Sequence, residues 1–355
     1  MSLWRIFVLF AIGIWLYLVW RGSRRPDRRA AANKDREAIG TEHHGRPAPR
    51  LTERTEAEIL AAAERDKYPA AALAEQFSTL SPDTARRLLE SCHSGATLDF
   101  RGLTSLSEDS AAVLAQHLGP VCLNGLTTLA PECAAVLARL WAPLVLNGLR
   151  SISEQTASAL AQHHGWLSLD GLTSLSPEVA RCLAQHRHIS HLGDFYNSLS
   201  LGGLQDLGNE SSAALAEYPG NLKLNGLRTL SETTARCLAR HHTDTQWDVA
   251  EQYSLMLDGL EQLSDEAAIA ISEYRGGLSL DGLTVLSTTA IRAFANHPGQ
   301  ALSLGRLDAM PDDVAAMFGA RRKSLHMPSL RNVSPLGVEL LRQNPDVILP
   351  ASGPQ

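Results

Sequence analysis

Histidine side chains return at one point of an internal repeat, and neutral imidazole is the commonest metal ligand among protein side chains. Tyrosine takes the same place in two copies, so the full column is His117, His163, His186, Tyr218, His241, Tyr274 and His297. The histidines stand about one repeat apart, without the clustered carboxylate or thiolate partners of a closed metal site. The pattern therefore predicts no metal and no other cofactor. The favourable position of a cation at a helix C-terminus explains the histidines instead.

A second column consists of Asn and Asp, whose oxygen atoms could bind calcium. Its members directly precede a glycine in six copies of the repeat: Asn124, Asn147, Asp170, Asn225, Asp258 and Asp281. Asn-Gly and Asp-Gly are strong turn signals because these residues tolerate positive φ. We expect turns at these positions and no calcium site.

Two insertions in the repeat, residues 187–197 and 243–252, bring aromatic and charged side chains to one rim of the molecule. Aromatic residues make up only 5% of the chain, so their concentration in the insertions favours a binding role. The candidate partner-binding residues are His191, Asp194, Phe195, Tyr196, Asp244, Trp247 and Asp248. The insertions lie two repeats apart, about 10 Å along the stack. The alternative is that the two loops only pack on each other.

No catalytic residues are predicted. The sequence contains no G-x-S-x-G, no H-E-x-x-H and no phosphate-binding glycine loop. Turns account for the repeated glycines. A metal-dependent activity of the His and Asp residues in the insertions is the alternative to a non-enzymatic protein.

A repeat of nearly fixed length must position these side chains. A glycine-leucine pair marks the copies at Gly102-Leu103, Gly125-Leu126, Gly148-Leu149, Gly171-Leu172, Gly203-Leu204, Gly226-Leu227, Gly259-Leu260 and Gly282-Leu283. Successive pairs are 23 residues apart, except for steps of 32 and 33 residues at the two insertions. Such a period predicts a solenoid, in which each unit buries its apolar face against the next copy.

Each copy predicts a strand, a turn and a helix of roughly three turns. Leucine or a related residue stands four and two positions before the glycine, as in Leu144 and Leu146, which places both on one side of a strand. Serine then stands at the expected helix N-cap, as in Ser153. The residue between the two leucines points the other way, and we expect it to face solvent on the concave side. That concave column is Asp99, Cys122, Val145, Ser168, Ser200, Lys223, Met256, Ser279, Ser303 and His326.

The L-x-L strand, the later leucines and the 23-residue period resemble bacterial leucine-rich-repeat proteins over about residues 75–349. The resemblance implies an α/β solenoid, with parallel strands on the concave face and helices on the convex face, that recognises proteins without catalysis by the repeats. In the usual consensus motif of that family, L-x-x-L-x-L-x-x-N, the asparagine lies two residues further from the strand than Asn or Asp does here. We therefore do not expect the ladder of asparagine side chains that is typical of that family. We assign residues 55–349 to the solenoid, with about ten repeats and an N-terminal cap, and residues 350–355 to a tail.

A membrane anchor is predicted at residues 1–22. Ile6–Trp20 carries no charge, and Trp4 and Trp20 bracket it like interfacial anchors, so residues 3–20 would lie in the bilayer. As a helix this stretch is about 25 Å long, slightly short of a hydrocarbon core of about 30 Å. A cleaved signal peptide, with a site at Ala30–Ala32, is the alternative.

Charge divides the chain at about residue 50. Residues 1–50 hold ten Lys/Arg and four Asp/Glu, a balance of +6, so the rest of a chain with net charge −6 carries −12. This acidity argues against nucleic acid as a partner. The arginines after the anchor place the solenoid in the cytoplasm, joined by a flexible charged tether at residues 23–54. A cleaved signal would make the protein secreted or periplasmic.

Together these features predict a membrane-tethered, non-enzymatic interaction scaffold that binds a protein partner through the concave face and the two rim insertions. The alternative is a structural or self-associating spacer protein of the cell envelope.

Overall fold

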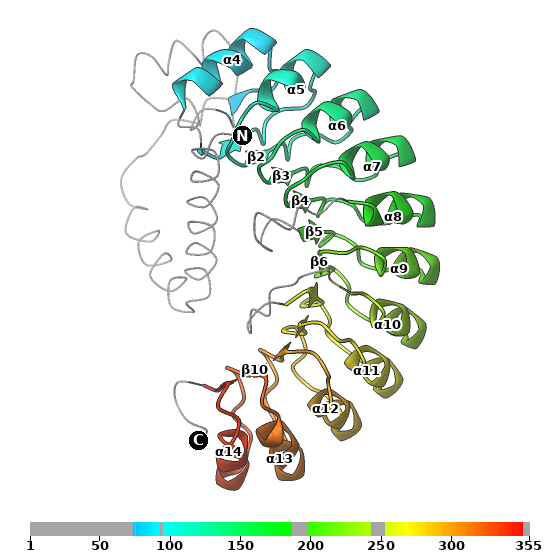
Figure 1. Cartoon of the computed structure of the whole chain (residues 1–355), viewed down its shortest axis with the longest axis vertical. Coiled ribbons are helices and arrows are strands. Elements are labelled where there is room, and N and C mark those ends of the chain that lie inside the picture. The colour runs from blue at the N-terminus through cyan, green and yellow to red at the C-terminus, as the bar shows by residue number, and fades with distance from the viewer. Residues whose placement is uncertain (1–73, 75, 93–94, 187–197, 243–252, 351–355) are drawn as a thin grey trace, which may run out of the picture.

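The repeats stack into an arc, with strands along the inner side and helices along the outer side (Figure 1). The computed structural model describes residues 74, 76–92, 95–186, 198–242 and 253–350. The predicted anchor and tether, both insertions and residues 351–355 lie outside these ranges. Within them, no helix is both long enough and apolar enough to cross a bilayer.

One parallel sheet runs through the whole arc, with eleven strands in chain order. Leucines face leucines across it, as where Leu144 pairs with Leu167. This confirms the predicted parallel stack, and β11 extends the ten predicted units by one strand. The strands are β1 (Leu98–Asp99), β2 (Val121–Cys122), β3 (Leu144–Val145), β4 (Leu167–Ser168), β5 (Ser198–Ser200), β6 (Asn221–Lys223), β7 (Leu255–Met256), β8 (Leu278–Ser279), β9 (Ala301–Ser303), β10 (Ser324–His326) and β11 (Val347–Ile348).

Leucines from successive repeats merge into one continuous apolar core between the sheet and the helices. Both strand leucines of a repeat, such as Leu144 and Leu146, are fully buried, and so is the later Leu149. Full burial of one such side chain stabilises the fold by about 1.5–3 kcal/mol. The shared interior explains why single repeats need their neighbours, as expected from the period.

Serine caps most of the helices, as predicted. Ser153, for example, accepts a hydrogen bond from the Thr156 N–H at the start of its helix. Every described helix except α12 and α14 has Asp or Glu in its first turn. The helices are α4 (Pro82–Ser91), α5 (Glu108–Leu114), α6 (Pro131–Leu137), α7 (Glu154–Leu160), α8 (Pro177–Ala184), α9 (Asn209–Leu215), α10 (Glu232–Leu238), α11 (Asp265–Ser272), α12 (Thr288–Ala295), α13 (Asp312–Ala320) and α14 (Pro335–Leu341).

Most helices are shorter than the three turns expected. A typical one has 7 residues, which is about two turns. Beyond the end of α7 the backbone tightens to i→i+3 bonds, since the His163 N–H donates to the Leu160 carbonyl at 2.9 Å. This tighter turn ends the α-helix early and directs the chain toward the next strand.

The Asn-Gly and Asp-Gly pairs form the predicted turns, but for a different reason. Around Asn147-Gly148, the Leu149 N–H donates to the Leu146 carbonyl at 3.2 Å. Gly148 does not adopt the left-handed conformation, and a methyl group there would overlap the carbonyl oxygen of Asn124 in the preceding repeat. Close approach of neighbouring repeats, and not positive φ, therefore requires the glycine.

Candidate functional site

The Asn/Asp column forms a ladder of side chain to backbone hydrogen bonds, which the sequence analysis did not expect. The Asn147 Oδ1 atom accepts the Asp170 N–H at 2.9 Å, one repeat further on. The same bond is made in two series, from Asn124 to Gly202 and from Asn225 to Gly305. Each series ends at a glycine, which has no side chain to continue it. The two-residue shift from the usual motif thus moves the ladder to the turn without removing it.

Four concave serines are tied to this ladder, so the prediction that they face solvent is wrong. Ser168 donates to Asn147 Oδ1 at 2.8 Å, and Ser200 donates to Asp170 Oδ1 at 2.6 Å. Ser279 and Ser303 make the same bond to the carboxylates of the preceding repeats. All four serines are at most 5% exposed. They stabilise the strand ends and offer little surface to a partner.

Lys223 and Trp166 meet near the middle of the concave face. The Lys223 Nζ atom lies 5.3 Å from the centre of the Trp166 ring, which is within cation–π range. Burial lowers the pKa of Lys223, while the carboxylates of Asp170 and Asp258 oppose that shift. Of the other concave positions, Cys122, Val145 and Met256 are partly exposed. The centre of this face therefore presents the Lys223 cation against an aromatic ring, with two carboxylates nearby and partly exposed apolar side chains on other strands.

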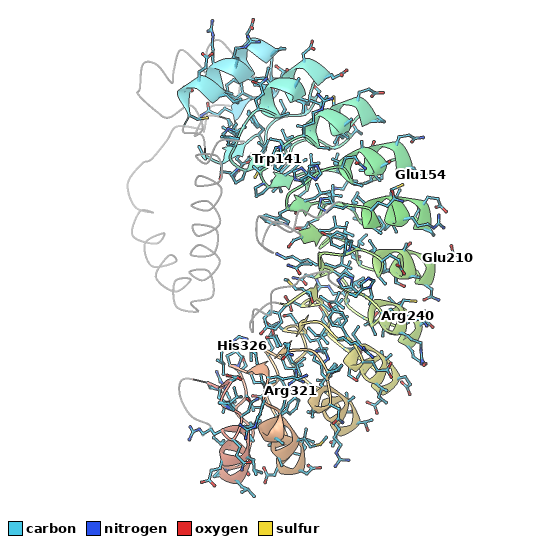
Figure 2. The ribbon with its side chains drawn as sticks, in the orientation of Figure 1. Trp141, Glu154, Glu210, Arg240, Arg321 and His326 are labelled. Carbon is cyan, nitrogen blue, oxygen red and sulfur yellow. The ribbon has the colours of Figure 1, made fainter. Side chains whose placement is uncertain are left out.

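Trp141 and His164 extend this surface. Neither of them, nor Trp166, was among the site residues predicted from the sequence. The rings of Trp141 and His164 lie 5.7 Å apart, and Trp141 is 39% exposed. Figure 2 shows Trp141 on the inner side of the arc and Glu154 on the outer side. Trp141 and His164 each stand three residues before the first leucine of their strand, so aligning the repeats at that position could have found the pair.

The predicted helix-end column is buried, so the explanation of its histidines as cations at helix C-termini is wrong. Six rings from consecutive repeats lie next to one another, with neighbouring centroids 5.8–6.4 Å apart. We call this set the ring column; its members are His163, His186, Tyr218, His241, Tyr274 and His297. None is more than 3% exposed.

Burial keeps the histidines of the ring column neutral. It lowers the pKa of His163, His241 and His297 to about 4 and that of His186 to about 3. No ring nitrogen of His163 or His241 makes a hydrogen bond of standard geometry within the described ranges, although nearby backbone groups partly oppose the fall in pKa. A neutral imidazole at these places acts as a core side chain. No group of three or more His, Cys, Asp or Glu in the described ranges could hold a metal ion.

The seven candidate residues of the insertions, His191, Asp194, Phe195, Tyr196, Asp244, Trp247 and Asp248, lie outside the described residues. The structure does place the bases of the insertions. One insertion follows His186 and leads into β5, and the other follows His242 and leads to β7. Strand β6 alone separates β5 from β7, so the two bases share one rim at the predicted separation of two repeats.

Comparison with known proteins adds no family assignment. No protein-family profile matches the chain, and no curated protein sequence does. The fold is similar to a chain of the crystal structure of the Rad7 and Elc1 complex in yeast, at 14% identity and a TM-score of 0.38, covering 84% of this chain and 90% of that chain. It is also similar to an internalin from Listeria monocytogenes, at 13% identity and a TM-score of 0.30, covering 84% of this chain and 95% of that chain.

The repeat geometry itself defines the class of protein. The repeats contribute strands to a single parallel sheet and helices to its outer side, with a shared leucine core, and six of the turns between them are Asx-Gly. The chain is therefore an α/β solenoid of the leucine-rich-repeat-like type.

Proposed function

We propose that the protein is a membrane-tethered, non-enzymatic interaction scaffold that binds a protein partner through its concave face and the two rim insertions. The observation that carries this proposal is the position of the insertion bases, which flank β6 on one rim. Lys223, paired with Trp166, lies on that same strand. Tryptophan and other aromatic residues are enriched among the residues that contribute most of the binding energy at protein interfaces.

Alanine substitution of the insertion aromatics tests the binding site. In the variant with Phe195→Ala, Tyr196→Ala and Trp247→Ala, the full chain should lose the partner that wild type captures from solubilised membranes of its own cells. A matched control replaces three exposed apolar residues elsewhere, Ile269, Val285 and Leu336, by alanine. Circular dichroism and melting temperature should not change. Equal capture by wild type and the insertion variant would refute the site.

The membrane tether is proposed from the apolar stretch at residues 3–20, with the solenoid on the cytoplasmic side. Protease treatment of intact cells tests this arrangement. A cytoplasmic solenoid stays protected until the membrane is opened. Digestion in intact cells would contradict the cytoplasmic placement, and release of the protein by carbonate extraction would contradict the anchor.

A structural spacer is the second candidate function. It is favoured by the commitment of the concave serines to the Asx ladder, which leaves fewer polar groups on that face for a partner. A spacer that self-associates should form oligomers as its concentration rises. Light scattering of the detergent-solubilised full chain separates the two functions, since a monomer at high concentration rejects self-association.

A further inference from the structure

The ring column runs along the solenoid and passes the points where the two insertions begin. His186 is the last described residue before the first insertion, and His241 lies next to His242, the last described residue before the second. Each ring packs between loops of adjacent repeats, since neighbouring rings belong to consecutive units. A charge placed on one ring therefore acts on the contact between two repeats.

The surroundings of the ring column oppose protonation. Partly exposed or exposed histidines lie close by: His164 near His163 and His186, and His242 near His241. Like charges at this range disfavour the cationic form. Backbone groups act the other way and favour the cation, but burial outweighs them at both His163 and His241. These groups belong to Ala138, Leu140 and Trp166 at His163, and to Ala216, Gly220 and Ser254 at His241.

His297 also meets backbone carbonyls, here at hydrogen-bond distance. Its two nitrogens lie 3.0 Å from the Ser272 carbonyl oxygen and 3.2 Å from the Gly276 carbonyl oxygen, which favours a second proton. Arg321 and Lys323 face the ring and oppose this. The net result is still a pKa lowered to about 4, so His297 contributes to the expected effect as the other three histidines do.

We propose that the ring column is an acid-sensitive element, so that at about pH 5 the repeats from α7 to α12 separate from one another while α13 and α14 stay packed. The C-terminal repeats are spared because other side chains bridge them. Arg321 donates to the His297 carbonyl at 2.8 Å, and Asn344 donates to the Lys323 carbonyl at 3.0 Å. Neither side chain changes charge near this pH.

The direction follows from proton linkage. The folded-state pKa of these histidines lies below the unfolded value of about 6.5, so the fold is fully stabilised above pH 6.5 and loses stability as the pH falls toward 4. At pH 5 a histidine with a folded pKa of about 4 lowers the folding equilibrium constant about 30-fold. The four histidines of the ring column together lower it by about 10⁶-fold, which is within the range of a domain's whole folding constant.

The chain provides its own non-titrating replacements. Leu140 takes the place of the histidine one repeat before His163, and tyrosine takes it at Tyr218 and Tyr274. The variant with His163→Leu and His241→Tyr therefore removes two titrating groups with side chains that the repeat already accommodates. His242→Asn is the matched control, because His242 is exposed.

Hydrogen exchange of the full chain at pH 7.5 and pH 5.0, corrected for intrinsic rates, tests the proposal. In wild type, amide protection from α7 to α12 should fall about 10⁶-fold, and that of α13 and α14 should fall less than about 10-fold. The double variant keeps His186 and His297, so it should lose only about 10³-fold, and the control should match wild type. An equal loss in wild type and the double variant, or an equal loss along the whole arc, would overturn the proposal.

A second measurement needs no variant. Magnetic resonance of labelled imidazoles in wild type should show these rings neutral while the repeats stay packed, with charge appearing only together with the loss of amide protection near pH 5. Titration of the rings near pH 6.5 with amide protection retained would equally overturn the proposal. Loss of partner binding at pH 5 is a further consequence that rests on the proposed function. Hydrogen exchange is measured without a partner, so failure of that function leaves the acid opening testable.

Discussion

Asn147→Ala removes one rung of the Asx ladder at a protected position. The wild-type side chain accepts the Asp170 N–H at 2.9 Å and the Ser168 hydroxyl at 2.8 Å. In the variant the Ser168 hydroxyl can still donate to Asp170 Oδ2 at 3.0 Å, so losing its bond to Asn147 costs little. The Asp170 N–H is left without its acceptor, and an unsatisfied backbone donor costs about 1–3 kcal/mol. We expect a destabilisation of about 2 kcal/mol, or a melting temperature lower by about 4–8 °C.

The same substitution at Asn225 is the matched control. Asn225 accepts the Asp258 N–H at 3.1 Å, but this rung is exposed, so water replaces the lost acceptor. We expect Asn225→Ala to destabilise the fold by less than about 0.5 kcal/mol. Urea unfolding at pH 7.5, followed by circular dichroism, measures both variants. If Asn147→Ala costs no more than Asn225→Ala, the ladder is not a source of stability and the reasoning fails.

Two further predictions concern glycine and a helix cap. Gly148→Ala should lower the free energy of unfolding by about 3 kcal/mol or more, because the added methyl group meets the Asn124 carbonyl of the preceding repeat. Gly208→Ala is the control: no atom lies within 4 Å of its added methyl group, so thermal unfolding should show a change within about 0.5 kcal/mol. Ala130 begins α6 without a side-chain cap, so Ala130→Ser should add about 1 kcal/mol to the free energy of unfolding, and the reverse change Ser153→Ala should remove a similar amount. Unchanged stability in either capping variant would contradict the capping argument.

The repeat, the strands and the serine caps could be predicted because each depends on a local pattern. Leucines two positions apart lie on the same side of any strand, whatever surrounds it. The cap of Ser153 likewise involves only the first turn of its own helix. The helix length could not be predicted in the same way. The tight turn after Leu160 that shortens α7 depends on the position of the next strand.

The polar columns were misjudged because their environment comes from neighbouring repeats. Ser168 alternates with buried leucines, which predicts an exposed side chain, yet it is buried by its bond to Asn147 of the preceding repeat. For the histidines a signal was present. Tyr218, Tyr274 and Leu140 share their column, and replacement by large apolar side chains is typical of a buried position.

Because every helix of the arc runs in the same direction, the carboxylates of the first turns collect along one edge of the solenoid. The opposite edge carries the exposed Arg240 and Arg275 together with the insertion bases. The first-turn edge is thus lined with negative charge, and it repels any negatively charged surface that approaches the arc from that side.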